Sequence, residues 1–282
     1  MKQPAGRPVA TAFVPGHVTG FFSAHPAPDP AVAGSRGAGI ALSDGVTVTV
    51  SHGSGLRLNG EAVDIDPVET VLDRLGVVAS VDAETPLPIG AGFGVSGAVA
   101  LGTALAANAA FDCGKTENEL VEVAHCAEVE AGTGLGDVVA QARGGLPIRL
   151  EPGGPRHGAL DGLPARPRIE YVTFGRLSTE TVLSGDTDQL SEAGATALDA
   201  LLAEPSVEAF MSACREFAAD AGLLTDDVSE AIAAVEAAGG QAAMAMLGRT
   251  VFATGTGLSD AGYEPTVCRV DAAGGRLVDH DA

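Results

Sequence analysis

The hydrophobic and polar positions of the first 65 residues follow the short period of β-structure. Residues 8–14 (PVATAFV) and 38–50 (AGIALSDGVTVTV) contain many β-branched residues, which favour strands. The pair Asp44-Gly45 divides the second stretch, because Asp-Gly is a common hairpin turn. We therefore expect a β-meander in this region, with residues 14–26 forming a loop after its first strand.

Apolar residues take up helical spacing after this region, and capping residues mark where the helices begin. A glutamate three residues after Asp66 and another three residues after Thr116 each predict a capping box. Gly76 ends the first of these helices, and the second is expected to reach about residue 131. Between them, residues 96–110 are rich in alanine and predict a further helix.

The second half of the chain repeats this mixture of helices and strands. Helices are expected over 186–203, 206–221 and 227–238, the last capped by Asp227 with Glu230; strands are expected over 76–84, 146–150 and 168–174, on either side of Gly248-Arg249, and as a pair at 266–270 and 276–279. Residues 151–167 are rich in glycine and proline, so we place a domain boundary there, between 1–155 and 156–282. The predicted fold class is α+β, in two domains.

The charge of the chain excludes some classes of partner. Its 37 acidic residues outnumber 16 basic ones, giving a net charge of −21, and only Lys2 and Lys115 are lysines. Such a surface repels nucleic acid and anionic membranes. The composition resembles that of proteins from salt-loving microbes, since molar salt shortens the Debye length to about 3 Å and screens the repulsion between carboxylates.

The sequence also indicates where the chain works. It has no apolar run long enough for a membrane span, and residues 1–13 lack the apolar segment of a signal peptide. Its four cysteines are scattered, which favours buried free thiols in a reducing compartment over disulfides or zinc ligands. We expect a cytoplasmic protein without nucleic-acid or membrane partners. The sequence allows a homodimer but does not decide the oligomeric state.

The stretch from Pro86 to Asn108 (PLPIGAGFGVSGAVALGTALAAN) is the first candidate for chemistry. Its glycines precede a helix, whose first N–H groups have no intrahelical partner and can bind an anion. Ser96 at the start of that helix could contact a phosphate oxygen or a magnesium ion. The alternative is close helix packing, because glycine and alanine also allow helices to approach each other.

Three carboxylates follow in the stretch EVEAGTGLGD. Glu128 shares a helix face with the apolar Val121, whereas Glu130 points elsewhere, so Glu128 is expected to face the interior. A buried carboxylate needs a partner, and a metal ion would serve. Asp137 follows a glycine-rich turn, where it is either a helix N-cap or a catalytic base.

A further set of polar residues lies near the N-terminus, in VPGHVTGFFSAHP and GSRGAGI. His17, Thr19 and Ser23 could line a substrate pocket in the first stretch. Arg36 lies between glycines in the second, where a tight turn could present its guanidinium to a carboxylate; a solvated surface arginine is the alternative.

These stretches together resemble the GHMP kinase superfamily, which includes galacto-, homoserine and mevalonate kinases. Residues 88–98 (PIGAGFGVSGA) are similar to the family motif P-x-x-x-G-L-G-S-S-A and keep its second serine, Ser96. The first and third motifs of the superfamily are replaced here by VPGHVTGFFSAHP and AMAMLGRTVFA. Both replacements, and the stretch GTGLGDVVAQ, resemble the archaeal pantoate kinases.

This resemblance implies a fold and a reaction. The fold would pair an N-terminal domain that contains the phosphate loop with a C-terminal ferredoxin-like α+β domain. The reaction would transfer a phosphoryl group from ATP to (R)-pantoate, giving 4-phosphopantoate, an early step of coenzyme A synthesis in archaea. The alternatives are another small hydroxy acid or alcohol as acceptor, of the homoserine or mevalonate type, and a nucleotide sensor without catalysis.

The resemblance also implies roles for residues. ATP would bind along the loop at Pro88, Gly90, Ala91, Gly92, Phe93, Gly94, Val95, Ser96 and Gly97. Mg²⁺ would be held by Ser96 and by Glu128 or Glu130, and Asp137 would be the catalytic base. Pantoate would contact His17, Thr19, Ser23 and Arg36.

Overall fold

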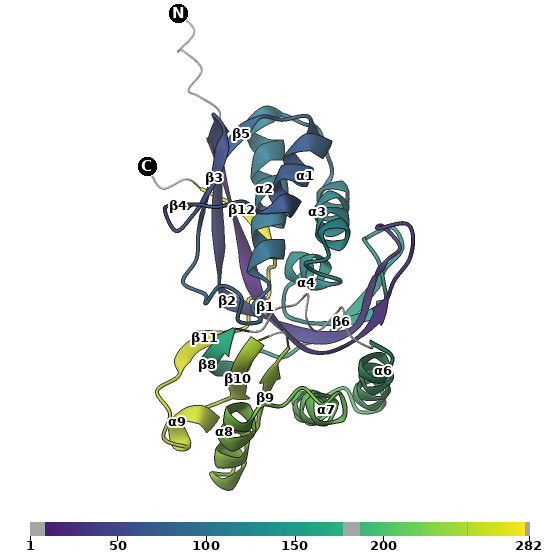
Figure 1. The fold of residues 1–282 in the computed structure, drawn as a ribbon, viewed down its shortest axis with the longest axis vertical. Coiled ribbons are helices and arrows are strands. Elements are labelled where there is room, and N and C mark those ends of the chain that lie inside the picture. The colour runs from purple at the N-terminus through teal and green to yellow at the C-terminus, as the bar shows by residue number, and fades with distance from the viewer. Residues whose placement is uncertain (1–8, 177–186, 247, 280–282) are drawn as a thin grey trace, which may run out of the picture.

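The protein folds into two lobes, each built on its own sheet (Figure 1). The computed structural model describes residues 9–176, 187–246 and 248–279. Both described ends of the chain lie in the first lobe, because the last strand returns to pair with the first. This arrangement confirms the predicted α+β class. The division at residue 155 stays a prediction.

The first lobe contains an eight-stranded sheet with the order β12-β1-β2-β5-β3-β4, in which β6 pairs with both β2 and β7. Its strands are β1 (Val9–His25), β2 (Gly34–His52), β3 (Gly55–Leu58), β4 (Glu61–Ala62), β5 (Ala79–Glu84), β6 (Leu146–Glu151), β7 (Ala159–Leu163) and β12 (Arg276–Val278). Most neighbours run antiparallel, but β3 pairs with β5 in parallel, so the expected simple meander is wrong.

Two long strands replace the loop and the hairpin expected near the N-terminus. Residues 14–26 were predicted to be a loop, but all but the last of them belong to β1, which pairs along its whole length with β2. Asp44-Gly45 does not turn the chain; Gly45 faces Pro15 beside a register shift in the ladder. A β-bulge has therefore absorbed the turn residues, and it lets the strands bend without ending.

Four helices cover one face of this sheet (Figure 1): α1 (Asp66–Leu75), α2 (Val95–Phe111), α3 (Glu117–Ala131) and α4 (Asp137–Arg143). The central helix α2 is buried along most of its length and has no charged residue. Its bounds confirm the predicted alanine-rich helix to within one residue at each end. The alanines and Gly102 serve close packing, because a Cβ at Gly102 would lie 2.5 Å from a methyl of Val48.

The expected helix caps were correct in one case and wrong in two. Thr116 and Glu119 form the predicted capping box on α3. Asp66 and Asp227 were expected to be N-caps, but the caps are Ile65 and Thr225, and neither side chain caps a backbone N–H of its helix. The Asp227 carboxylate instead accepts from the Thr225 hydroxyl and from Arg249 of the neighbouring strand.

The second lobe contains a four-stranded antiparallel sheet with the order β11-β8-β10-β9. Its elements are β8 (Arg168–Arg176), β9 (Ala242–Ala245), β10 (Gly248–Thr254), β11 (Thr266–Arg269), α6 (Thr187–Ala203), α7 (Val207–Asp220), α8 (Asp226–Ala237) and α9 (Gly257–Asp260). The last two strands were expected to pair with each other. They lie in different sheets, because β11 pairs with β8 and β12 with β1. Gly248 and Arg249 lie within β10 and not at the turn of its hairpin.

The two lobes share one hydrophobic core. Phe21 of β1 packs against Phe210 and Phe217 of α7, with ring centroids 6.3 and 6.4 Å apart. Beside them the N–H of Met246, which follows β9, donates to the carbonyl of Thr19 over 2.9 Å. The hairpin of the second sheet is therefore fixed against the strand that crosses the centre of the molecule, where α4 also packs.

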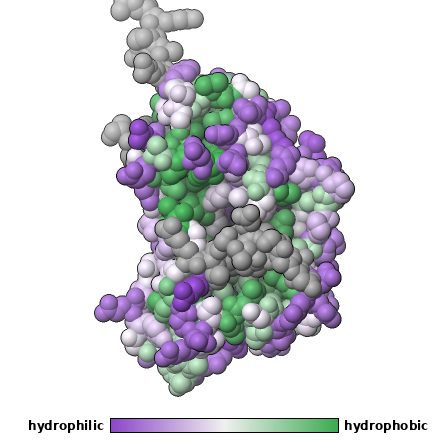
Figure 2. Space-filling model, in the orientation of Figure 1, coloured by the Kyte–Doolittle hydropathy of each residue, from purple (hydrophilic) through white to green (hydrophobic). Residues whose placement is uncertain are grey.

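On the face shown in Figure 2, hydrophilic residues are spread over both lobes, with hydrophobic patches between them. This agrees with carboxylates spread over every part of the chain. All four cysteines are free thiols, and Cys126, Cys214 and Cys268 are buried. Within the described ranges, no helix combines the length and the hydrophobicity that crossing a bilayer requires.

Candidate active site

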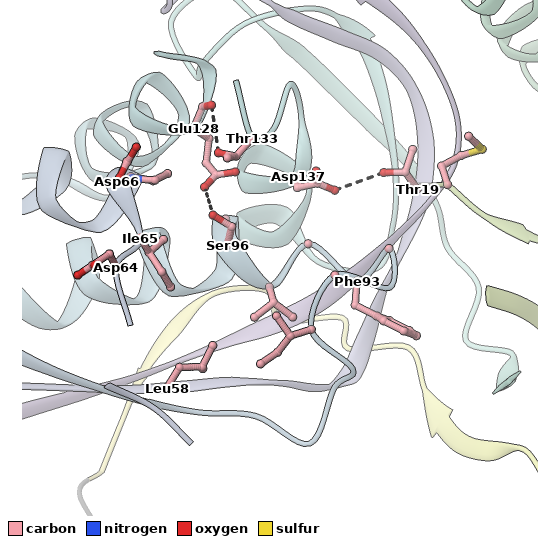
Figure 3. Close-up of a pocket in the computed structure, with 18 residues that line it drawn as sticks. Thr19, Leu58, Asp64, Ile65, Asp66, Phe93, Ser96, Glu128, Thr133 and Asp137 are labelled. Atoms are coloured by element: carbon pink, nitrogen blue, oxygen red, sulfur yellow. Dashed lines mark hydrogen bonds between the residues drawn. The ribbon is translucent and has the colours of Figure 1, made fainter. Parts of the chain in front are cut away.

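A cavity of about 440 Å³ lies where the glycine-rich loop, α2 and α4 meet (Figure 3). Its lining includes Ser96, Glu128 and Asp137, which three different helices contribute. Most of the predicted phosphate loop also lines it: Gly90, Gly92, Phe93, Gly94, Val95, Ser96 and Gly97. Pro88 and Ala91 are part of the same loop but do not face the cavity. The tertiary structure thus brings together residues predicted separately.

The loop reaches the start of α2 through backbone conformations that favour glycine. Gly90, Gly92 and Gly94 have φ angles of 74°, 90° and 61°, in the left-handed region. Gly94 is the N-cap, and no side chain caps the helix there. The first N–H groups of α2, from Val95 onward, therefore have no intrahelical acceptor and are available to an anion in the cavity.

The hairpin of the second sheet holds this loop in place. Thr250 of β10 donates its hydroxyl to the carbonyl of Ala91 over 2.9 Å. A Cβ at Gly248 would lie 2.0 Å from the same carbonyl oxygen, so the two backbones touch. Phe93 packs on Tyr171 with ring centroids 4.7 Å apart. The second sheet thus contacts the phosphate loop through Gly248, Thr250 and Tyr171.

Ser96 and Glu128 form a hydrogen-bonded pair at one wall of the cavity. The Ser96 hydroxyl donates to Oε1 of Glu128 over 2.6 Å (Figure 3). Glu128 is only 2% exposed, and this burial raises its pKa to about 7, although the Ser96 bond opposes the shift. The carboxylate therefore lies where a cation would be stabilising.

The geometry distinguishes Glu128 from Glu130, the other glutamate considered for the metal. Glu130 lies outside the cavity and forms an ion pair with Arg74 on the surface. Among the described residues, no three His, Cys, Asp or Glu side chains cluster closely enough to hold a metal ion by themselves. Mg²⁺ is commonly held by one or two carboxylates together with substrate phosphates, and Ser96 with Glu128 fits that pattern.

Asp137 is the first residue of α4, but it is not the N-cap that one interpretation predicted. The N-cap is Gly136, and no side chain caps the helix. The Asp137 carboxylate turns instead to β1, where Oδ1 lies 2.7 Å from Nδ1 of His17 and 3.3 Å from the Thr19 hydroxyl. Burial would raise the Asp137 pKa, but these bonds and the charge of Arg149 hold it below its ordinary value.

The predicted substrate residues lie at different depths along β1 and β2. Thr19 lines the cavity, whereas His17 is fully buried behind Asp137. Ser23 and Arg36 face each other further along the two strands, outside the lining of the cavity. Arg36 was expected in a tight glycine turn; it lies in a regular strand, and its Nε donates to the carbonyl of Leu150 over 2.7 Å.

Arg149 of β6 is a candidate residue that sequence reasoning missed. It is 2% exposed, and its Nε and Nη1 are buried without a hydrogen-bond partner among the described residues. It packs against the backbone beside Asp137, since a Cβ at Gly136 would lie 2.6 Å from its Nε. An arginine within the apolar strand LPIRL was the available signal, because arginine is rarely buried unless it is paired.

The wall of the cavity formed by β3 and the start of α1 was also not predicted. Leu58, Ile65 and Pro67 contribute apolar side chains to it, and Asp64 and Asp66 contribute carboxylates (Figure 3). Gln141 of α4, another missed residue, donates from Nε2 to the carbonyl of Gly94 over 2.8 Å. This bond ties the helix that carries Asp137 to the end of the phosphate loop.

The comparisons with known proteins agree with this geometry. Residues 66–145 match the family model of the GHMP kinases N terminal domain, a range that contains the loop, Glu128 and Asp137. Pantoate kinase of Thermococcus kodakarensis is 39% identical in an alignment 261 residues long, which covers 86% of each chain. The chain belongs to the pantoate kinase family. Pantoate kinase of Methanospirillum hungatei is 34% identical, covering 87% of each chain.

A solved structure extends the comparison beyond the site. The chain described as a phosphotransferase related to the CoA biosynthesis pathway matches with a TM-score of 0.85 and 32% identity, over 96% of this chain and 98% of that one. This structural match therefore covers both lobes, including the second sheet that supports the phosphate loop.

Proposed function

We propose that this protein is an ATP-dependent kinase that phosphorylates (R)-pantoate to 4-phosphopantoate. The observation that carries the proposal is one cavity that joins a free helix N-terminus, the Ser96–Glu128 pair and Asp137. Phosphoryl transfer requires positioning and charge neutralisation more than covalent chemistry, and these are the groups that supply both. The choice of pantoate as acceptor is supported by relatives that are 34–39% identical over most of the chain.

The loop would bind the phosphates of ATP through its backbone. The first residues of α2 line the cavity, so their N–H groups lie at its edge, at the positive end of the helix dipole, which favours negative charge. Ser96 and Glu128 would hold Mg²⁺ against those phosphates. When bound, the ion supplies positive charge to the transferred group. The apolar side chains of Leu58, Ile65 and Pro67 suit the nucleoside.

Asp137 would accept the proton of the attacking hydroxyl. Its Oδ1 is already bonded to His17 and Thr19, so Oδ2 is the oxygen available to the substrate. A pKa below the ordinary value keeps the carboxylate ionised at neutral pH.

The carboxylate of pantoate would be bound by Arg149. A buried guanidinium with two unpartnered nitrogens is costly unless an anion pairs with it, and a carboxylate accepts from arginine in a bidentate manner. The charge of Arg149 acts on Asp137, which places the two groups near each other. Ser23 and Arg36 remain predicted contacts further along β1 and β2.

A panel of acceptors tests the proposal. ADP release is measured with (R)-pantoate, homoserine and mevalonate in concentrated potassium chloride, and the product is identified by mass spectrometry. We expect ADP release well above the acceptor-free rate with pantoate alone. A faster reaction with homoserine or mevalonate would identify that compound as the substrate in place of pantoate. ATP binding without any phosphorylated product would favour a nucleotide sensor.

We further propose that the chain works in a concentrated-salt, reducing cytoplasm. The excess of acidic residues, the two lysines and the four free thiols support this. Its melting temperature should rise from low to molar potassium chloride, because the salt screens repulsion between carboxylates. A melting temperature that falls with salt would contradict the proposal.

A further inference from the structure

We propose that His17 is the positioning residue of Asp137: it holds one carboxylate oxygen from behind so that the other faces the cavity. The inference deepens the proposed function, on which it rests. It gives His17 a task different from the substrate contact expected from the sequence. It also explains why a fully buried histidine lies in the middle of β1, among mostly apolar buried residues.

The contacts divide the two oxygens of Asp137 between two tasks. Oδ1 accepts from His17 Nδ1 at 2.7 Å and from the Thr19 hydroxyl at 3.3 Å. Oδ2 lies on the other side, where a Cβ at Gly134 would be 3.6 Å from it and 2.7 Å from Oε2 of Glu128. The oxygen held by β1 is therefore turned away from the Glu128 side of the cavity, and the free oxygen is turned toward it.

The surroundings of the ring fix which proton His17 carries. Its Nε2 is buried without a partner among the described residues, and it packs against Gly39, where a Cβ would lie 2.3 Å away. A proton on Nε2 would be a buried donor with no acceptor, which is costly. Burial also lowers the pKa of His17, although the bond to Asp137 opposes the shift. The neutral ring with its proton on Nδ1 is the form that fits.

Charged groups from two other elements act on the pair. Arg149 of β6 lowers the pKa of both His17 and Asp137, and Asp137 in turn raises the pKa of Glu128 on α3. Removing the His17 bond leaves those groups in place but takes away a donor that favours the ionised Asp137. The pKa of Asp137 should then rise, and the acidic limb of the kcat profile should move to higher pH.

Two variants separate the hydrogen bond from the space that the ring fills. His17→Leu removes the donor and keeps much of the volume, whereas His17→Asn places an amide N–H where Nδ1 lies. We expect kcat to fall about 100-fold in His17→Leu, within the range of general-base catalysis, with the KM for ATP little changed. His17→Asn, the smaller side chain, should recover most of kcat. The acidic limb should shift upward in His17→Leu only.

The outcomes decide between positioning and simple packing. If His17→Asn is no more active than His17→Leu, the donor is not what matters and the proposal is wrong. Loss of kcat in His17→Leu with an unmoved acidic limb would also overturn it. Thermal melts of both variants show whether they fold; if neither folds, the spectroscopic measurement below decides alone.

An NMR measurement keeps this inference separate from the proposed function. Long-range ¹H–¹⁵N correlation spectra of the wild-type protein distinguish the two neutral tautomers of histidine and the imidazolium. We expect His17, assigned through the sequential backbone assignment of the wild-type protein, to be neutral with the proton on Nδ1 at neutral pH. An Nε2-protonated ring or an imidazolium would overturn the proposal, even if the protein phosphorylates pantoate. A protein that phosphorylates nothing but shows the expected tautomer would refute only the proposed function.

Discussion

The C-terminal part of α3 and the first residue of α4 each place a carboxylate in the same cavity. The two environments shift the pKa values of these carboxylates in opposite directions. Burial raises the pKa of Glu128 to about 7, with the Ser96 hydroxyl as its side-chain donor. The Asp137 side chain is 20% exposed, and His17, Thr19 and the charge of Arg149 hold its pKa below the ordinary value. Deeper burial raises the pKa of Glu128, whereas the bond to His17 and the nearby charge of Arg149 lower that of Asp137.

This difference supports the separate tasks proposed for the two carboxylates. Asp137 is supplied with donors by the protein itself, so it is ionised before any ligand binds and can accept a proton through its free oxygen. Among the described residues no cation pairs with Glu128, so a bound cation would favour its ionised form. Pairs of titratable groups whose environments push their pKa values apart are typical of sites with divided roles.

The largest expected effect comes from removing the charge of Asp137. Asp137→Asn keeps the volume and an oxygen for His17, but it cannot accept the hydroxyl proton. We expect kcat to fall about 10²- to 10⁴-fold, with ATP affinity nearly unchanged. Coupled ADP-release kinetics and calorimetry with ATP measure the two quantities. A kcat of Asp137→Asn within a few-fold of the wild-type value would show that Asp137 is not the catalytic base.

Replacing Glu128 should stabilise the fold at alkaline pH. Its pKa rises from 4.5 to about 7 on folding, so stability falls as pH rises through this interval and the loss is complete above it. Glu128→Gln does not titrate, and without Mg²⁺ it should exceed the wild type by about 3 kcal/mol at pH 8.

Urea titrations without divalent ions, in concentrated potassium chloride, measure the free energy of unfolding for this comparison. The difference between Glu128→Gln and the wild type should largely disappear near pH 4.5, where glutamate is largely protonated in the native state. A difference that stays constant between pH 4.5 and pH 8 would mean that burial does not raise the pKa of Glu128 in the protein without Mg²⁺.

The magnesium requirement should separate Glu128 from its neighbour on α3. Glu128→Gln should raise the half-saturating Mg²⁺ concentration about 10- to 100-fold, since a charge-assisted contact of about 1.5–3 kcal/mol is lost. Glu130→Gln is the matched control, because Glu130 lies on the surface beside Arg74 and should change little. Equal effects of the two variants would contradict the assignment of the cation to Glu128.

The smallest effect is expected for Ser96→Ala. The variant removes one neutral oxygen from the cation and the donor from Glu128, so we expect a rise of a few-fold to about tenfold in the half-saturating Mg²⁺ concentration. Magnesium titrations of activity at saturating ATP measure it. An unchanged titration would show that Ser96 serves only to bond Glu128.

Local signals determined much of what the sequence predicted correctly. The capping box of Thr116, the helix over 95–111 and the glycines before it depend on neighbouring residues, so they were predictable. The same holds for the inward direction of Glu128, which follows from helical period. Asp137 was recognised by its place after a glycine-rich turn, but its alternative as an N-cap could not be excluded there.

Only the tertiary structure decided which strands pair and which side chains meet at Asp137. Asp44-Gly45 has the composition of a turn, yet a β-bulge absorbs it because β1 and β2 pair along their whole length. His17 is 120 residues from Asp137 in the chain, and nothing in its local sequence indicates that the two side chains meet. The opposite pKa shifts of Glu128 and Asp137 depend on burial and on His17, Thr19 and Arg149, which come from strands β1 and β6, so no local pattern contains them.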